Sequence, residues 1–233
     1  MKYNKEIVDK MLAAVFPLPA KFGVYSTDDP KFHQCQGFSD SARLNRVLSE
    51  IDPQVAINYG MTKMVIIAPS LGEVVIKIPF NGFYAFEEGT RFWYKLPYGS
   101  YSYCMSEYKK FCELKHLNLK GFLAKTIFYE ERDGVCIFLQ EKVNPRDEMI
   151  KAPHCSFESQ EIVKKWQKMN TFPILDAEWT AVCIDKYGKF KTEKFLYYCM
   201  DFDNDLIEDW RDENIGYRDN GTPVILDYAN FLF

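Results

Sequence analysis

The sequence predicts an α+β protein, and three patterns lead to that class. Residues 4–15 and 39–51 carry apolar side chains at helical spacing. Residues 54–79 and 124–139 hold five short runs rich in Val and Ile, which are typical of strands. From residue 144 onward the pattern is mostly helical and closes in a hairpin.

The first two helices are predicted from their apolar stripes and their ends. Leu44, Val47, Leu48 and Ile51 line one face of the second helix, and Ser39 or Asp40 can cap it. Prolines end both helices, at residues 16–19 and at 52–53. The stripe of the first helix consists of Ile7, Val8, Met11, Leu12 and Val15.

The strands come next along the chain. Residues 55–57, 64–67 and 74–78 read as a three-stranded meander with tight connections. Residues 80–100 are aromatic and punctuated by glycine, and we expect a loop insertion there. A helix over 102–117 follows. The strands 124–129 and 135–139 then complete a five-stranded antiparallel sheet.

The last part is predicted to be helical over 156–169 and 191–200, with 175–187 ambiguous. Ser156-x-x-Ser159 resembles a capping pattern. Asp219-Asn220-Gly221 is a strong turn signal between strands at 214–217 and 223–226.

These elements suggest three parts: an N-terminal helical extension over 1–53, a sheet lobe over 54–143 and a mainly helical part over 144–233. The 233 residues suffice for two modest lobes.

Composition narrows the function classes. A net charge of −4 gives no reason to expect nucleic acid or an anionic membrane as a partner. No run has the length of a membrane span. Seven irregularly spaced cysteines without a CxxC argue against a disulfide framework or a zinc site, so we expect a cytoplasmic protein with reduced thiols.

The residues that carry chemistry are spread along the chain in a fixed order. Lys77 ends the apolar run Val74-Val75-Ile76, and Glu107 lies on the following helix, where it can pair with that lysine. Asp209 and Asn214 flank a short loop, and Asp227 ends the last strand. A lysine, a carboxylate that fixes it, an orienting Asp and two oxygen ligands for Mg²⁺ are what phosphoryl transfer from ATP requires.

Three further residues are weaker candidates for the same site. Gly60 is the glycine of the first hairpin and a candidate for a phosphate-covering turn. Arg211, two residues after Asp209, could neutralise charge on a transferring phosphate. Glu113 rivals Glu107 on the same helix.

The acidic segment before Asn214 has an alternative interpretation as a calcium loop. Asp201, Asp203, Asp205 and Asp212 occupy positions 1, 3, 5 and 12 of such a loop. Leu206 stands where the loop needs glycine, and position 12 lacks the bidentate Glu.

With these motifs in place, the chain resembles the protein-kinase-like superfamily over residues 54–233. Asp209-Trp210-Arg211-Asp212-Glu213-Asn214-Ile215 resembles the catalytic loop D-[LM]-K-x-E-N-[IL]. Val224-Ile225-Leu226-Asp227-Tyr228-Ala229 resembles the strand leading to D-F-G, and Val75-Ile76-Lys77 resembles V-A-I-K. The compact form is similar to the small kinase-like proteins of bacteriophages, where a D-x-H-x-G-N loop precedes a P-x-I-x-D strand.

The resemblance implies a two-lobed kinase-like fold with a truncated, mainly helical C-lobe, and it assigns roles. Asp209 would be the catalytic base, and Asn214 and Asp227 the Mg²⁺ ligands. Lys77, held by Glu107, would bind the α- and β-phosphates of ATP. The segment from Glu141 to Val143 would meet adenine as the hinge between lobes. The location would be the cytoplasm, that of the host if the protein is viral.

Three functions follow from these motifs. The first is an ATP- and Mg²⁺-dependent phosphotransferase that acts on a protein or a small molecule. The second is a pseudokinase that binds or blocks a protein partner, because Tyr228-Ala229 replaces Phe-Gly and Ile207-Glu208 replaces His-Arg. The third is an interaction protein whose motif match is accidental. Oligomeric state is left open.

Overall fold

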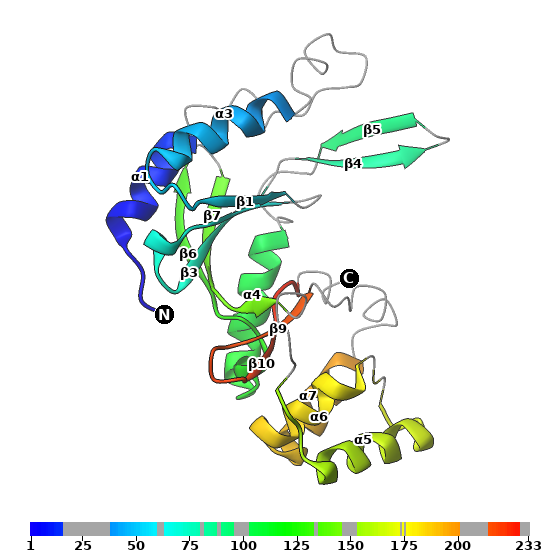
Figure 1. Ribbon diagram of the computed structural model, residues 1–233. Coiled ribbons are helices and arrows are strands. Elements are labelled where there is room, and N and C mark those ends of the chain that lie inside the picture. Colours follow the sequence, from blue (N-terminus) through cyan, green and yellow to red (C-terminus); the bar gives the residue numbers. More distant parts are fainter. Residues whose placement is uncertain are drawn as a thin grey trace. The chain divides into compact units, whose positions relative to one another are not determined.

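The computed structural model in Figure 1 describes residues 1–15, 38–59, 63–79, 82–87, 90–95, 103–132, 135–145, 153–172, 174, 176–200 and 214–228. Within these ranges the chain has six α-helices and a five-stranded antiparallel sheet, so it is an α+β protein. It divides into two compact units. Unit 1 comprises Met1–Tyr108 and Thr126–Glu141, and unit 2 comprises Lys109–Lys125 and Lys142–Phe233.

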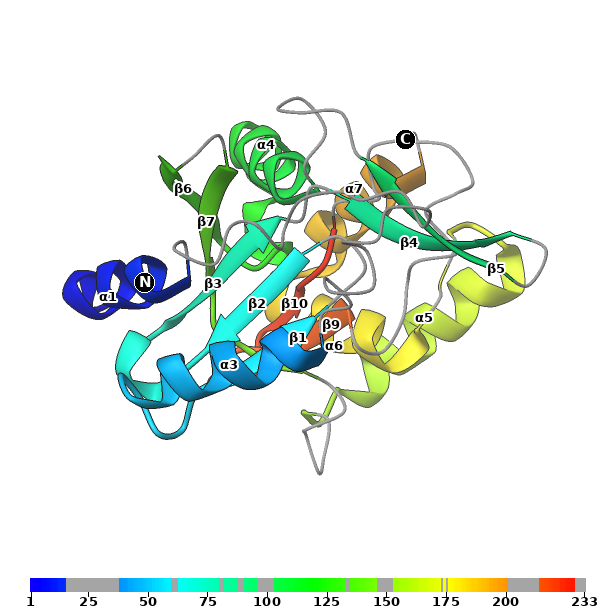
Figure 2. The same ribbon diagram turned by 90° about the horizontal axis from the view of Figure 1, so that it is seen from above.

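The sheet of unit 1 has the order β1-β2-β3-β7-β6, and Figure 2 shows its strands side by side. All neighbouring strands are antiparallel. The strands are β1 (Ala56–Tyr59), β2 (Lys63–Ile67), β3 (Val74–Pro79), β6 (Thr126–Arg132) and β7 (Val135–Glu141). The five strands expected from the sequence are therefore confirmed, and they form one sheet.

One face of this sheet is apolar because alternate residues of each strand point to the same side. Met64, Ile66, Ile76 and Leu139 lie on that face and are fully buried. They share a core with the helices α1 (Lys5–Val15) and α3 (Phe38–Ser49) through Met11, Leu12, Leu44 and Leu48, among others. Helices α1 and α3, which come from the segment expected as a helical extension, thus contribute directly to the core of unit 1.

Residues 80–100 were expected to form a loop insertion, and the structure corrects this for residues 82–87 and 90–95. Strands β4 (Gly82–Glu87) and β5 (Thr90–Lys95) pair from Gly82 opposite Lys95 to Glu87 opposite Thr90. Aromatic residues in both runs have high strand propensity, and the short connection lets the two runs pair locally. Within the described part of the chain, this hairpin pairs with no other strand.

Helix α4 (Tyr103–His116) follows the hairpin, and the division between the units falls within it. Its continuation, the 3₁₀ turn η3 (Lys120–Phe122), belongs to unit 2. Among the described helices, none has both the length and the apolar character needed to cross a bilayer.

The helices of unit 2 are α5 (Phe157–Met169), α6 (Ala177–Tyr187) and α7 (Lys189–Met200). The Ser156 side chain caps α5 by accepting a hydrogen bond from the Ser159 N–H, as its sequence pattern predicts. Asp176 caps α6 in the same way through the Trp179 N–H. The segment 175–187, ambiguous in sequence, is therefore mostly helix.

Unit 2 also holds a small sheet in the order β10-β9-β8. Its strands are β8 (Asn144–Pro145), β9 (Ile215–Tyr217) and β10 (Pro223–Ile225), of which β9 and β10 form the predicted hairpin. The Arg218 guanidinium donates to the carbonyls of Gly121 at 3.0 Å and Leu123 at 3.3 Å. This ties the hairpin to the segment after α4.

Candidate functional site

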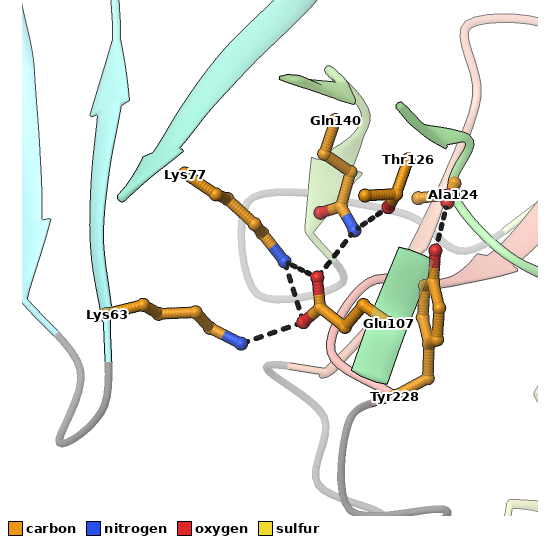
Figure 3. A network of polar contacts seen from close by, with 7 residues as sticks. All are labelled: Lys63, Lys77, Glu107, Ala124, Thr126, Gln140 and Tyr228. Atoms are coloured by element: carbon orange, nitrogen blue, oxygen red, sulfur yellow. Dashed lines mark hydrogen bonds and ion pairs between the residues drawn. The ribbon is translucent and has the colours of Figure 1, made fainter. Parts of the chain in front are cut away.

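A buried polar network in unit 1 is centred on the Glu107 carboxylate of α4 (Figure 3). The Lys77 ammonium lies 2.9 Å from Oε1 and 2.8 Å from Oε2 of this carboxylate. The Lys63 ammonium contacts Oε1 at 2.8 Å. The pairing of Lys77 with Glu107 expected from the sequence is present, and a second lysine joins it.

Strand register explains why both lysines reach the same carboxylate. Lys63 opposes Pro79 and Val65 opposes Lys77, so the two lysines are diagonal neighbours on adjacent strands. Residues that oppose each other, and residues two apart, share a face of a sheet. The lysines therefore lie on the face opposite to the apolar core of α1 and α3.

The same face carries the rest of the network. Gln140 opposes Val75 on β3 and Thr126 on β6. Its amide donates to Glu107 Oε2 at 3.3 Å and lies 3.0 Å from the Thr126 hydroxyl oxygen. Side chains from four strands, β2, β3, β7 and β6, thus form the polar network around Glu107 of α4.

Burial makes these contacts energetically important. The Glu107 side chain is 0% exposed, that of Lys77 5% and that of Lys63 8%. Removing charged groups from water is costly, and close opposite charges with good hydrogen bonds offset that cost. Losing one partner of such a pair is strongly destabilising, whereas an exposed pair contributes little.

The rival glutamate on α4 has a different environment. Glu113 is six residues after Glu107, which turns it by about 240° around the helix. Its carboxylate contacts Lys110 at 3.1 Å and the Tyr198 hydroxyl at 2.8 Å, in unit 2. Burial, followed by the contact with Glu113, raises the pKa of Tyr198 well above its ordinary value. Of the two glutamates, Glu107 is the one that contacts Lys77.

Unit 2 holds the second group of sequence candidates, at the open end of the β9–β10 hairpin. Asn214 immediately precedes β9, and Asp227 follows β10 by two residues. The backbone N–H of Leu226 donates to the Asn214 carbonyl at 2.7 Å. Asn214 and Asp227 are both half-buried and belong to the same end of this hairpin.

The residue after Asp227 anchors that end of the hairpin. Tyr228 is fully buried, and its hydroxyl donates to the Ala124 carbonyl at 2.7 Å. The Ala124 N–H in turn donates to the Ile225 carbonyl at 2.9 Å. These bonds fix the backbone on both sides of Asp227, and they satisfy the polar tip of a buried tyrosine.

The donor types at this end suit a hard divalent cation. A carboxylate and a side-chain amide supply oxygen atoms, which Mg²⁺ prefers. In the part of the chain that the structure describes, no group of three or more His, Cys, Asp or Glu side chains could hold a metal. Asp209, whose predicted role is catalytic base, lies outside the described residues, as do Arg211, Gly60 and the four aspartates of the calcium interpretation.

The predicted hinge falls where the chain passes between the units. Glu141 is the last residue of β7 and of that part of unit 1, and Lys142 begins the second segment of unit 2. Glu141 opposes Val74 on β3. Val143 is half-buried. Adenine binding by this segment stays a prediction, as does the convergence of Lys77 and Asp227 on one nucleotide.

Sequence reasoning missed three members of the buried network: Lys63, Gln140 and Thr126. Lys63 is the polar residue of β2, and Gln140 follows an apolar run in β7, so a polar residue at the end of an apolar run is the signal that could have found these two. Thr126 begins a strand that also carries charged residues, and its sequence gives no such signal. Comparisons of the chain with protein-family models, with curated proteins and with solved structures find no match.

Proposed function

We propose that this chain is a kinase-like protein that binds MgATP and transfers its γ-phosphoryl group to a protein or a small molecule. The observation that carries the proposal is the buried ion pair between Lys77 on β3 and Glu107 on the next helix, α4. In protein kinases, a β3 lysine paired with a helix glutamate holds the ATP phosphates, and this pair is needed for activity.

The surroundings of the pair support the same proposal. The lysine lies in the middle strand of a five-stranded antiparallel sheet, and its helix comes between β3 and β6 in the chain. An ammonium group on a packed strand offers a fixed positive charge to a phosphate. A carboxylate that contacts this ammonium with both oxygens restricts its position, which favours pre-organised binding.

The proposal assigns the binding of Mg²⁺ to residues of the hairpin in unit 2. Asn214 and Asp227 would hold Mg²⁺, whose contribution when bound is to neutralise charge on the β- and γ-phosphates. Asp209 would orient the acceptor hydroxyl and accept its proton, and Arg211 would face the transferring group. The hydroxyl oxygen attacks the γ-phosphorus, the bond from that phosphorus to the bridging oxygen breaks, and ADP leaves.

The first test is nucleotide binding by the intact chain. At a ligand concentration 100 times its Kd, binding stabilises the folded state by about 2.7 kcal/mol. For a chain of this length, that corresponds to a rise in Tm of about 5–10 °C. We expect this shift with MgATP, and a clearly smaller one for Lys77→Met. No shift for the wild type at millimolar MgATP would contradict the proposal.

The second test separates transfer from binding alone. The protein is incubated with γ-labelled ATP, and label on protein or on added hydroxyl acceptors is measured for the wild type, Asp227→Ala and Asp219→Ala. Asp219 is an exposed residue in the turn at the other end of the same hairpin, so it is the matched control. We expect transfer to be lost in Asp227→Ala alone. Binding without transfer would favour the pseudokinase hypothesis, and transfer that survives Asp227→Ala would refute the assigned metal site.

A further inference from the structure

We propose that Lys63 is a second phosphate-binding lysine, so that the site grips the polyphosphate of a nucleoside di- or triphosphate with two ammonium groups. The inference rests on the proposed nucleotide site and extends it to a residue on a different strand. Lys63 and Lys77 contact the same oxygen of Glu107, at 2.8 and 2.9 Å. Their ammonium groups are therefore close together, and a phosphate that meets Lys77 is within reach of Lys63.

The backbone geometry of β2 and β3 allows Lys63 and Lys77 to contact the same polyphosphate. Lys63 begins β2 and lies on the same sheet face as Lys77, diagonally across one strand pair. Both side chains are held along packed strands. Their ammonium groups can meet neighbouring oxygens of a polyphosphate chain with little loss of side-chain entropy on binding.

Two ammonium groups meet at one carboxylate in this network. Lys77 already contacts both oxygens of Glu107, and Gln140 donates a further hydrogen bond to Oε2. Burying another ammonium beside Lys77 adds a desolvation cost and a like-charge repulsion. A bound phosphate that contacts both ammonium groups would offset that repulsion.

Substitution of Lys63 should affect the binding of nucleotides that carry phosphates but not the binding of adenosine. Lys63→Met is expected to weaken ATP and ADP binding by at least about tenfold, because a charge-assisted hydrogen bond is lost. Adenosine affinity should stay unchanged. Lys10→Met is the matched control, since Lys10 is an exposed lysine of unit 1 that is also ion-paired, with Glu6 at 2.7 Å. Lys63→Arg keeps the charge and should restore much of the affinity.

The decisive experiment uses the wild-type chain, so that folding of a variant is not at issue. The probe is an ATP acyl phosphate, whose acyl group passes to a nearby lysine amine as ATP leaves. Peptides are then mapped by mass spectrometry, with and without excess ATP as competitor. We expect ATP-sensitive labelling at both Lys63 and Lys77.

The outcomes separate this inference from the proposed function. Labelling of Lys77 without Lys63, together with unchanged ATP affinity in Lys63→Met, would overturn the inference and leave the nucleotide site standing. If neither lysine is labelled and the wild type binds no ATP, the proposed function fails and the inference fails with it.

Discussion

Replacing Glu107 by glutamine should destabilise unit 1 far more than any exposed ion pair could. The carboxylate is fully buried and contacts the ammonium groups of Lys63 and Lys77 at 2.8–2.9 Å. The amide keeps one acceptor oxygen but turns an NH₂ group toward a cation. Removing one partner of a buried pair costs about 3–5 kcal/mol. The retained acceptor places our expectation at the lower end, about 3 kcal/mol.

The expected loss is large enough to measure directly. For a chain of this length it corresponds to a fall in Tm of about 6–12 °C. Hydrogen exchange followed by mass spectrometry can locate the destabilised region, because peptides from β2, β3 and β7 should lose protection first. The matched control is Glu161→Gln on α5, whose carboxylate also lies 2.8 Å from a lysine, Lys164, but whose pair is 49–64% exposed. That variant should change stability by less than about 0.5 kcal/mol.

Two results would refute the reasoning about Glu107. The first is a loss no larger than that of the control, which would mean that the network adds nothing to stability. The second concerns the double-mutant cycle with Lys77→Met. Residues in contact within one network typically couple by about 0.5–3 kcal/mol. Strictly additive losses for Lys77→Met and Glu107→Gln would therefore show that the pair does not interact energetically.

Three further predictions concern unit 2. Gly216→Ala should lower Tm in a melting experiment, because its Cβ would lie 2.5 Å from the Asn144 carbonyl oxygen, which belongs to backbone and cannot easily move. Tyr228→Phe should cost about 0.5–1.5 kcal/mol in urea unfolding, the usual contribution of one hydrogen bond, here to the Ala124 carbonyl. Burial raises the pKa of Asp185, but hydrogen bonds from the start of α5 outweigh it and hold this pKa below its ordinary value of 3.8. The Asp185 carboxylate should therefore stabilise the fold above that value and lose its contribution as the pH falls through the lowered pKa, so the Tm advantage over Asp185→Asn should be present at pH 7 and vanish in strong acid.

Local patterns in the sequence were enough to predict the sheet of unit 1 and the Lys77–Glu107 pair. The strands alternate or run apolar over short distances, and turn residues separate them, so their existence is a local property. The lysine ends an apolar run, and the next helix supplies two candidate carboxylates, those of Glu107 and Glu113. Choosing Glu107 over Glu113, however, depends on which side of α4 meets the sheet, and that is a tertiary property.

Other elements were not predictable for physical reasons. The participation of Lys63 depends on the register of β2 against β3, since a shift by one residue would turn it to the opposite face. The sequence of helix α6 shows no clear apolar stripe because its own buried residues, among them Trp179, Val182 and Ile184, follow one another around the helix. The β4–β5 hairpin looked like a loop because Gly82 and Gly89 flank its first aromatic run.

Measurements of stability and of ATP binding can together decide whether the Glu107 network serves the fold alone or also binds a phosphate. A purely structural network should lose stability when any of its members is removed. If Lys63 serves a phosphate, Lys63→Met should cost less stability than Glu107→Gln, because Glu107 keeps both contacts with Lys77 and one like-charge repulsion is gone. Glu107→Gln should still destabilise, since it leaves both ammonium groups behind. If Lys63→Met is stable but binds ATP weakly, the second lysine is kept for its ligand. If Lys63→Met loses as much stability as Glu107→Gln and binds ATP normally, the second lysine is kept for the fold.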